Sequence, residues 1–221
     1  GPGVAGGLAD DLGAGIQRVV VEHRPREVEV GHVEGFHQGA AGEVGHGLPE
    51  DDAQARYIEV RCEGLTAIGI YLPNGNSRGE EGYAYKLAWM DLLADRIEAL
   101  LAIDTPLIVT GDFNVCPTDV DLAPNALPPN DALVRTETRA RFRRMIWAGM
   151  TDAIRAVTPE GPVYTFWDYQ AAAWERNSGL RIDHALLSAD VAERLVSAAP
   201  DRMEREQARA SDHVPVIVEI A

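Results

Sequence analysis

Short apolar runs alternate with long amphipathic segments over residues 48–221, and this alternation limits the possible folds more than any other feature. Two β-branched runs, 56–61 and 65–72, flank a Glu-Gly turn and predict a β-hairpin. Apolar residues recur with helical spacing over 82–102 and again over 137–149. Three more apolar runs predict further strands, at 107–110, 180–187 and 214–220. Strands that alternate with helices indicate an α/β domain built in layers.

Residues 1–47 have a different character. They are rich in glycine and show weak strand patterns at 16–21 and 27–30. Four histidines lie in this segment, but their spacing matches no known set of metal ligands and no cysteine accompanies them: His23, His32, His37 and His46. We therefore expect an atypical segment, 1–47, that precedes one domain over 48–221.

Composition excludes several classes of protein. The formal net charge of −15 argues against binding nucleic acid across the whole surface, although it allows a nuclease that gathers carboxylates around a metal. No apolar run reaches the roughly 18–20 residues of a membrane span, so we expect no membrane contact. There is no secretory signal pattern. The two cysteines, Cys62 and Cys116, lie far apart in the sequence, which favours reduced thiols over a disulfide framework. We expect a cytoplasmic monomer.

The apolar run at 107–110 ends in Gly111-Asp112-Phe113-Asn114. Because Asp112 and Asn114 are two residues apart, an extended backbone would direct both side chains to the same side. A carboxylate and a carboxamide that converge at a strand end suit a metal ion or an attacking water. An Asx turn that caps the strand is the alternative, and this segment alone does not distinguish the two.

Three further segments place polar residues at or within predicted strands. Asp183 lies inside the apolar run 180–187, where a buried carboxylate requires a partner. That partner is either a residue of a functional site or, in the structural alternative, Arg181 or another arginine in a salt bridge. Ser211-Asp212-His213 precedes the last strand, where the residues can face a metal and a phosphate or simply cap the strand. Pro73-Asn74-Gly75 taken alone is an ordinary turn. No Gly-x-Ser-x-Gly motif is present, so Ser211 is not predicted to be a nucleophile.

Together these segments closely resemble the endonuclease/exonuclease/phosphatase superfamily, in its exodeoxyribonuclease III branch of class II abasic-site endonucleases. The resemblance covers about residues 47–221. The matching segments are Tyr71-Leu72-Pro73-Asn74-Gly75, Gly111-Asp112-Phe113-Asn114, Tyr164-Thr165-Phe166-Trp167-Asp168-Tyr169, Gly179-Leu180-Arg181-Ile182-Asp183 and Ser211-Asp212-His213. The third and fourth segments separate this branch from phosphatases and lipases of the same fold. The resemblance implies a four-layer α/β sandwich, in which two mixed β-sheets are flanked by helices.

The resemblance also implies a role for each matching residue. Asp112 would orient or deprotonate the attacking water, and Asn114 would hydrogen-bond the scissile phosphate or the nucleophile. His213 would face a phosphate oxygen, with Asp183 fixing its ring, and Tyr71 would contact a phosphate through its phenol. These five residues are the predicted catalytic set.

A second set of residues is implied to bind metal and substrate. The metal is Mg²⁺, with Mn²⁺ as the alternative, and its implied ligands are Asp112, Asn114, Asp212 and His213. The implied substrate-binding residues, which include the apolar pocket for an abasic sugar, are Asn74, Phe166, Trp167, Leu180 and Ile182. The implied reactions are hydrolysis of the phosphodiester 5′ to an abasic site and 3′→5′ removal of nucleotides from duplex DNA, both in base excision repair.

The front of the chain departs from the family pattern. Members of this branch begin with a Trp-Asn pair and, some thirty residues later, a Gln-Glu pair that belong to the metal site; residues 1–50 contain neither pair. Either this segment comes from an altered reading frame or a misplaced gene start, or the chain is a divergent member. In both cases we expect an incomplete N-terminal sheet and weak or absent activity. The alternatives are a phosphoesterase of the same superfamily on a non-DNA substrate and an inactive family remnant.

Overall fold

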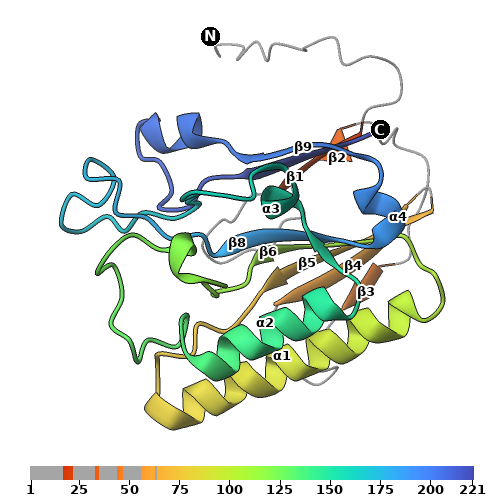
Figure 1. Cartoon of the computed structure of the whole chain (residues 1–221), viewed down its shortest axis with the longest axis horizontal. Helices are drawn as coiled ribbons and strands as arrows, with labels where there is room; N and C mark the ends of the chain where they lie inside the picture. The colour runs from red at the N-terminus through yellow and green to blue at the C-terminus, as the bar shows by residue number, and fades with distance from the viewer. Residues whose placement is uncertain (1–16, 22–32, 35–43, 47–55, 63) are drawn as a thin grey trace, which may run out of the picture.

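Two β-sheets packed face to face form the centre of the molecule (Figure 1). The computed structural model describes residues 17–21, 33–34, 44–46, 56–62 and 64–221. The smaller sheet has the strand order β2-β1-β10-β9 and the larger one β3-β4-β5-β6-β8-β7. The strands are β1 Gln17–Val21, β2 Val33–Glu34, β3 Val44–His46, β4 Tyr57–Cys62, β5 Leu65–Tyr71, β6 Leu107–Asp112, β7 Thr151–Asp152, β8 Asp183–Leu187, β9 Leu195–Pro200 and β10 Val216–Ile220.

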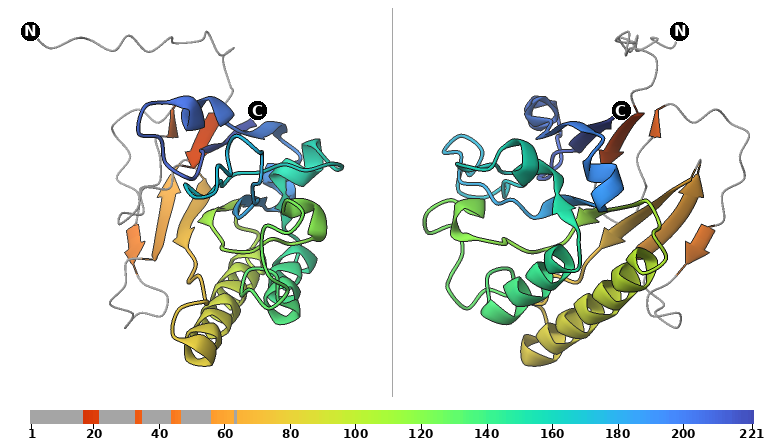
Figure 2. Two further views of the ribbon diagram at one scale, coloured as in Figure 1. Left: turned by 90° about the vertical axis from the view of Figure 1, so that its left-hand side faces the viewer. Right: turned by 45° about the vertical axis from the view of Figure 1, so that its right-hand side comes forward.

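Two long helices cover the other face of the larger sheet and lie side by side (Figures 1 and 2). They are α1 Gly79–Leu101 and α2 Thr136–Trp147. The shorter helices are α3 Ala153–Val157, α4 Ala189–Ala192 and the 3₁₀ turns Asp119–Asp121 and Arg202–Glu206. β5 runs parallel to β6 and β8 runs antiparallel to it, so the larger sheet is mixed. The predicted layered α/β fold is confirmed, and three of its layers are described: helices, larger sheet and smaller sheet.

The apolar pattern of the sequence builds two main cores. One lies between the larger sheet and the long helices, where side chains such as Ile68 and Val109 meet Trp89 and Leu93 from α1. The other lies between the two sheets and includes Val218 of β10. Alternation along β10 buries every second residue, which is the pattern of a strand with one face on a core.

Several predicted boundaries differ from the structure. The long helix begins at Gly79 rather than 82, because Arg78 takes a left-handed conformation with φ of 66° and two glutamates follow in the first turn, where the helix dipole favours them. β6 continues to Asp112, and β8 starts only at Asp183. Leu180 instead bridges to Phe166, outside the sheet. Asp183 is therefore the first residue of its strand and not an interior one.

The predicted strand at 16–21 is present as β1, which pairs antiparallel with β10 from Gln17–Ile220 to Val21–Val216. The run at 27–30, as well as His23, His32 and His37, lies outside the described residues. The boundary between an atypical segment and the domain thus stays a prediction. Among the described helices, none has the length and apolarity needed to cross a membrane.

Candidate active site

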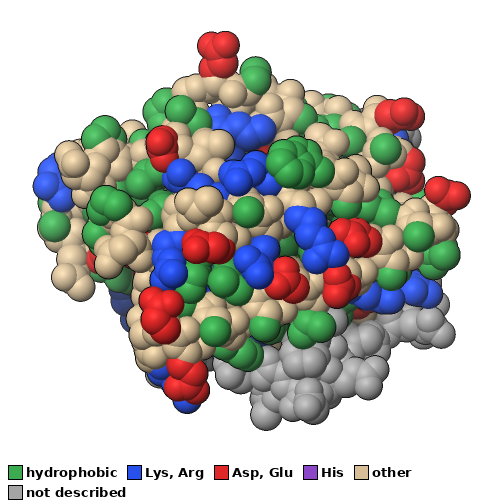
Figure 3. All heavy atoms as spheres, turned by 60° about the horizontal axis from the view of Figure 1, so that its bottom comes forward, with side chains coloured by type: hydrophobic (Ala, Val, Ile, Leu, Met, Phe, Trp, Pro, Cys, Tyr) green, Lys and Arg blue, Asp and Glu red, His purple; other side chains and the backbone are tan. Residues whose placement is uncertain are grey.

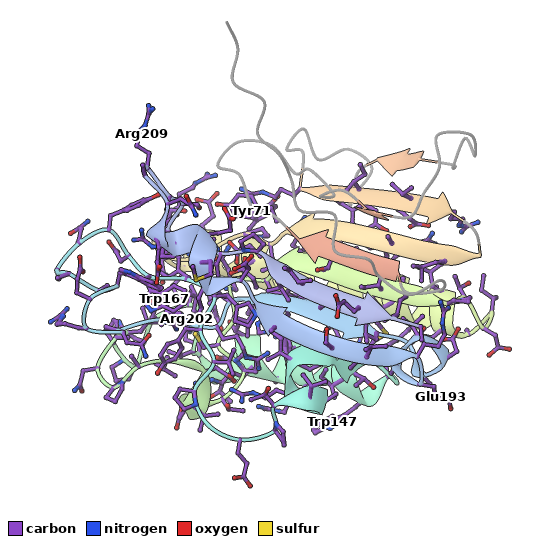
Figure 4. All side chains as sticks on the ribbon, turned by 90° about the horizontal axis from the view of Figure 1, so that it is seen from above. Tyr71, Trp147, Trp167, Glu193, Arg202 and Arg209 are labelled. Carbon is purple, nitrogen blue, oxygen red and sulfur yellow. The ribbon has the colours of Figure 1, made fainter. Side chains whose placement is uncertain are left out.

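Three neighbouring strands of the larger sheet bring polar residues to the same end. In the register of β5, β6 and β8, Tyr71 lies beside Asp112 and Asp112 lies beside Asp183. The sequence places these residues far apart, and the parallel and antiparallel pairing of the strands aligns them in one row. Figure 4 shows Tyr71 at this end, with Trp167 and Arg202 on the loops beyond it.

Asp112 and Asn114 form a compact unit at the end of β6. The Asn114 backbone N–H donates to Asp112 Oδ1 at 2.7 Å, and Asn114 Nδ2 donates to Asp112 Oδ2 at 2.9 Å. The predicted extended backbone was wrong here, because Asn114 has a left-handed conformation with φ of 48°. The two side chains converge because the chain turns at this point. The Asx turn and the convergence of the two side chains, which we set out as alternatives, therefore occur together.

The turn after β5 is linked directly to this unit. Asn74 Nδ2 donates to Asn114 Oδ1 at 2.8 Å, and Asn114 Nδ2 also donates to the Leu72 carbonyl at 2.9 Å. The ammonium of Lys86 donates to two carbonyl oxygens, that of Asn74 at 3.0 Å and that of Asn114 at 2.6 Å. Asn74 and Asn114 are therefore held in two ways: their side-chain amides bond to each other, and their backbone carbonyls bond to Lys86.

Asp183 and His213 form the second unit of the site. His213 Nδ1 lies 3.0 Å from each carboxylate oxygen of Asp183, which leaves Nε2 as the ring nitrogen without this contact. Thr165 Oγ1 donates to Asp183 Oδ2 at 2.6 Å and accepts the backbone N–H groups of Ile182 and Asp183, both at 3.1 Å. Arg181, the alternative partner of Asp183, forms its ion pairs elsewhere.

Charge and burial shift the pKa values of both units. Burial raises the pKa of Asp112 to about 7; the charge of His213 opposes this rise and that of Asp183 adds to it. Burial lowers the pKa of the His213 imidazole, but the Asp183 carboxylate more than offsets that effect and raises it to about 9. Burial, followed by the charge of Asp112, raises the pKa of Tyr71. Two carboxyl groups and one imidazole thus share this end of the sheet.

An apolar wall flanks the imidazole. The Phe166 and His213 rings lie 4.9 Å apart at an interplanar angle of 64°. Leu180 and Ile182 are buried beneath Phe166 in one cluster. Trp167 differs from its predicted place beside the substrate: it is completely buried, donates from Nε1 to Asn177 and packs against other loop residues. In this structure it supports the loop and is not a surface of the site.

A hollow of about 360 Å³ lies next to these residues. Its lining comes from the turn after β5 and the first two turns of α1, and includes Tyr71, Asn74, Arg78 and Tyr85. Arg56 also lines it, with its guanidinium 4.9 Å from the centre of the Tyr71 ring. Such a hollow beside strand ends is a common place for a ligand in α/β folds.

A buried ion network supports the site from behind. Completely buried Asp121 binds Arg181 Nε at 2.7 Å and Arg155 at 2.5 Å, while Arg181 also binds Asp152 at 2.7 Å. Arg181 further contacts His184 Nδ1 at 3.0 Å, and burial lowers the pKa of that histidine to about 4. These contacts connect the segment 180–184 to the loop that holds Asp121.

The described donors suit a hard cation only in part. Within the part of the chain that the structure describes, no three acidic, histidine or cysteine side chains form a metal-binding group. Both oxygens of Asp112 already accept hydrogen bonds, whereas Asp212 is partly exposed. Mg²⁺ needs one or two protein carboxylates and keeps its waters, so Asp112 and Asp212 fit such an ion. The glutamates before residue 51 that could complete the set lie outside the described side chains.

Sequence reasoning missed two residues of this site. Thr165 lies in a segment that we quoted for the resemblance, yet its hydroxyl was given no role. Lys86 falls on the apolar face of a predicted helix, between Tyr83 and Trp89 at helical spacing. A charged side chain in an apolar stripe was the signal that could have marked it.

Known proteins are similar to this chain in both sequence and fold. The chain is 33% identical over 78% of its length to an exodeoxyribonuclease of Bacillus subtilis and covers 66% of that protein, or about two thirds. It is 28% identical over 93% of its length to exodeoxyribonuclease III of Haemophilus influenzae and covers 88% of it.

Solved structures agree with this result. A Neisseria 3′ phosphatase bound to a product DNA hairpin aligns with a TM-score of 0.76 and 34% identity, over 81% of this chain and 70% of that one. An AP endonuclease of Archaeoglobus fulgidus aligns with a TM-score of 0.74 and 29% identity, over 80% and 69%. The model of the endonuclease/exonuclease/phosphatase family matches residues 19–213, and the chain belongs to this family of hydrolases.

Proposed function

We propose that this protein is an exodeoxyribonuclease III-like repair nuclease. It hydrolyses the phosphodiester 5′ to an abasic site in duplex DNA and removes nucleotides from 3′ ends, with Mg²⁺ as cofactor. The observation that carries the proposal is the placement of the Asp112–Asn114 unit and the Asp183–His213 pair side by side at one end of β6 and β8. The names of the relatives support DNA as the substrate.

The two units divide the chemistry between them. Asp112 is the base or orienting group for the attacking water, because its raised pKa makes it a proton acceptor near neutral pH. The Asn114 carboxamide directs that water and the phosphate. His213, charged through Asp183, donates from Nε2 to a phosphate oxygen, where fixed donors stabilise the charge that grows in the transition state.

A divalent ion would be held by Asp112 and Asp212, with Asn114 and His213 as the further ligands that the resemblance implies. When bound, it would polarise the phosphoryl oxygen and stabilise the leaving alkoxide. Tyr71 at the end of β5 would contact the phosphate through its hydroxyl. His213 fits the phosphate role better than the metal role, because Nδ1 is occupied by Asp183 and Mg²⁺ prefers oxygen ligands.

The apolar wall fits a sugar without a base. Phe166, with Leu180 and Ile182 beneath it, lies against the His213 ring and would receive the extruded deoxyribose. A nucleotide that lacks its base has little stacking to lose, which favours the damaged site over an intact one. Asn74 would contact the adjacent phosphate from the turn after β5.

The charge distribution fits local contacts to DNA. The α1–α2 face carries interspersed acidic and basic side chains (Figure 3), tied by ion pairs such as Arg144–Asp95 and Arg141–Asp91. Arg209, at the opposite side of the molecule from Trp147, extends outward near the loops of the site (Figure 4). We expect binding to weaken steeply with salt, since arginine contacts to phosphate release counterions.

The test uses a duplex with one tetrahydrofuran abasic-site analogue and a matched intact duplex with recessed 3′ ends. With Mg²⁺, the protein should cut on the 5′ side of the analogue and shorten the 3′ ends, and EDTA should stop both reactions. We expect slow turnover, because residues 1–50 contain neither the Trp-Asn nor the Gln-Glu pair of the family pattern. Binding without cleavage of either duplex, at any protein concentration with Mg²⁺ or Mn²⁺, would refute nuclease activity and indicate an inactive member.

A second candidate has a specific observation in its favour. The Neisseria structure that aligns with this chain at 34% identity is described as a 3′ phosphatase. A duplex that carries a 3′-terminal phosphate should therefore be included. Release of inorganic phosphate from that duplex, with no cut at the abasic analogue, would assign the site to phosphomonoesters on DNA.

A further inference from the structure

The chain contains a single lysine, and it is completely buried. Of the 20 basic residues, Lys86 is the only one that is not arginine. It lies on the inner face of α1, one turn before Trp89 and Met90 of the main core. Every other basic position is arginine, so Lys86 carries the one ammonium side chain of the sequence.

The environment of Lys86 is built for hydrogen bonding rather than for charge pairing. Its Nζ donates to two backbone oxygens, those of Asn74 and Asn114. These carbonyls belong to the residues whose side chains bond to each other at 2.8 Å. The ammonium therefore connects the turn after β5 to the turn after β6, directly behind the side chains that face the site.

The space around the lysine stem is tight. A Cβ added to Gly75 would lie 2.6 Å from Lys86 Cδ, and Gly75 itself has φ of 89°. A planar guanidinium is larger than an ammonium and needs its donors in a fixed fork. The turn at Gly75 and the lysine stem thus fit each other closely.

We propose that Lys86 is a positioning residue of the catalytic centre: by holding the backbone carbonyls of Asn74 and Asn114, it fixes their carboxamides and, through Asn114, the Asp112 carboxylate. The inference rests on the proposed function. Asn114 has a left-handed backbone, which asparagine tolerates, and its contacts with Asp112 and Lys86 hold this turn in place. Without the ammonium, this turn loses one of those contacts, and one buried and one partly buried carbonyl lose this donor.

The kinetic test compares Lys86→Met, Lys86→Arg and Met90→Ala in the full chain, on the abasic duplex with Mg²⁺. Met keeps an unbranched stem without a donor, and Met90→Ala is the matched control, since Met90 lies one turn away in the core. Lys86→Met and Lys86→Arg should lower kcat about 10- to 100-fold with KM within a factor of two, as expected for a small misplacement of reacting groups. Met90→Ala should lower Tm and keep kcat.

A chemical rescue separates the donor from its stem. Lys86→Ala leaves a cavity of the shape of three methylenes and an amine, so n-propylammonium should restore part of kcat, whereas n-propanol, similar in size, should not. Equal rescue by both compounds would show that only volume matters and would overturn the proposal. Full kcat in folded Lys86→Met would overturn it as well.

A readout without activity keeps this inference separate from the proposed function. The Asn114 backbone N–H donates to Asp112 Oδ1, so its hydrogen exchange reports the geometry of the turn. In Lys86→Met its protection should fall at least tenfold more than in Met90→Ala at equal Tm loss. Unchanged protection refutes the positioning role even if the wild-type protein cuts DNA. Lost protection in a protein that cuts no DNA would sustain the role and refute only the nuclease.

Discussion

Replacing Thr165 by valine should separate the orientation of Asp183 from its mere presence. The Thr165 side chain is completely buried, and its hydroxyl takes part in three hydrogen bonds with the segment 182–183. Valine has nearly the same shape, so the change removes the hydroxyl without opening a cavity. Thr165→Ser is the matched control, because it keeps the hydroxyl and loses only a methyl group.

The expected magnitude follows from these contacts. A hydrogen bond to a charged group contributes about 1.5–3 kcal/mol, and each buried N–H left without a partner costs about 1–3 kcal/mol. Because such terms are not additive, we expect Thr165→Val to lower the free energy of unfolding by about 3–5 kcal/mol. Loss of one buried methyl in Thr165→Ser should cost about 1 kcal/mol.

Urea denaturation at pH 7 measures both losses, and incision of the abasic duplex measures the functional consequence. In Thr165→Val, Asp183 can rotate away from His213 Nδ1, so kcat should fall together with stability, while Thr165→Ser should keep most of kcat. Equal destabilisation by valine and serine would refute the role of the hydroxyl. Full kcat in folded Thr165→Val would refute its link to Asp183.

Three other changes test the framework around the site. Asp121→Asn removes one of the two carboxylates that pair with buried Arg181 and should lower the free energy of unfolding by about 3 kcal/mol, measured in urea. Burial raises the pKa of Asp121, but the charge of Arg181 outweighs this effect and holds the pKa below its usual value. The stabilisation is therefore complete above about pH 4 and is lost as the pH falls further. In an acid titration, the free energies of unfolding of wild type and variant should converge. Gly111→Ala should prevent folding or abolish incision, because the new Cβ would lie 2.0 Å from the Ile70 carbonyl oxygen and Gly111 has φ of 135°; a soluble variant with wild-type circular dichroism and rate would contradict this. Arg202→Ala removes a guanidinium that lies 4.7 Å from one indole and 4.8 Å from another, so Tm should fall and tryptophan emission should shift, and an unchanged spectrum would count against this stacking.

Local patterns predicted the strands and the long helices because burial on one face leaves a period in the sequence. The hairpin of β4 and β5, the helix α1 and the strand β10 follow that rule. Their ends were less predictable, because Arg78 and Asn114 take left-handed conformations. No periodicity encodes such a choice.

The candidate site divides in the same way. The residues of the resemblance, such as Asp112 and His213, come from short segments that the sequence displays. The contacts between these residues cannot be read from the sequence, because Asn74 and Asn114 are 40 residues apart and meet only when β5 and β6 pair. The full burial of Trp167 also depends on the loop that folds over it, so its sequence context alone suggested a contact with substrate that its placement does not support.

The most direct test of the account is the incision rate of the abasic duplex by the wild-type protein and by Asp112→Asn, at equal concentration in Mg²⁺. Asparagine keeps the shape of Asp112 but cannot accept the proton of the attacking water. The account predicts a measurable wild-type rate and a loss of about 10²- to 10⁴-fold in the variant. Equal rates for the two folded proteins would contradict the assignment of Asp112 and, with it, the chemistry proposed for this end of the sheet.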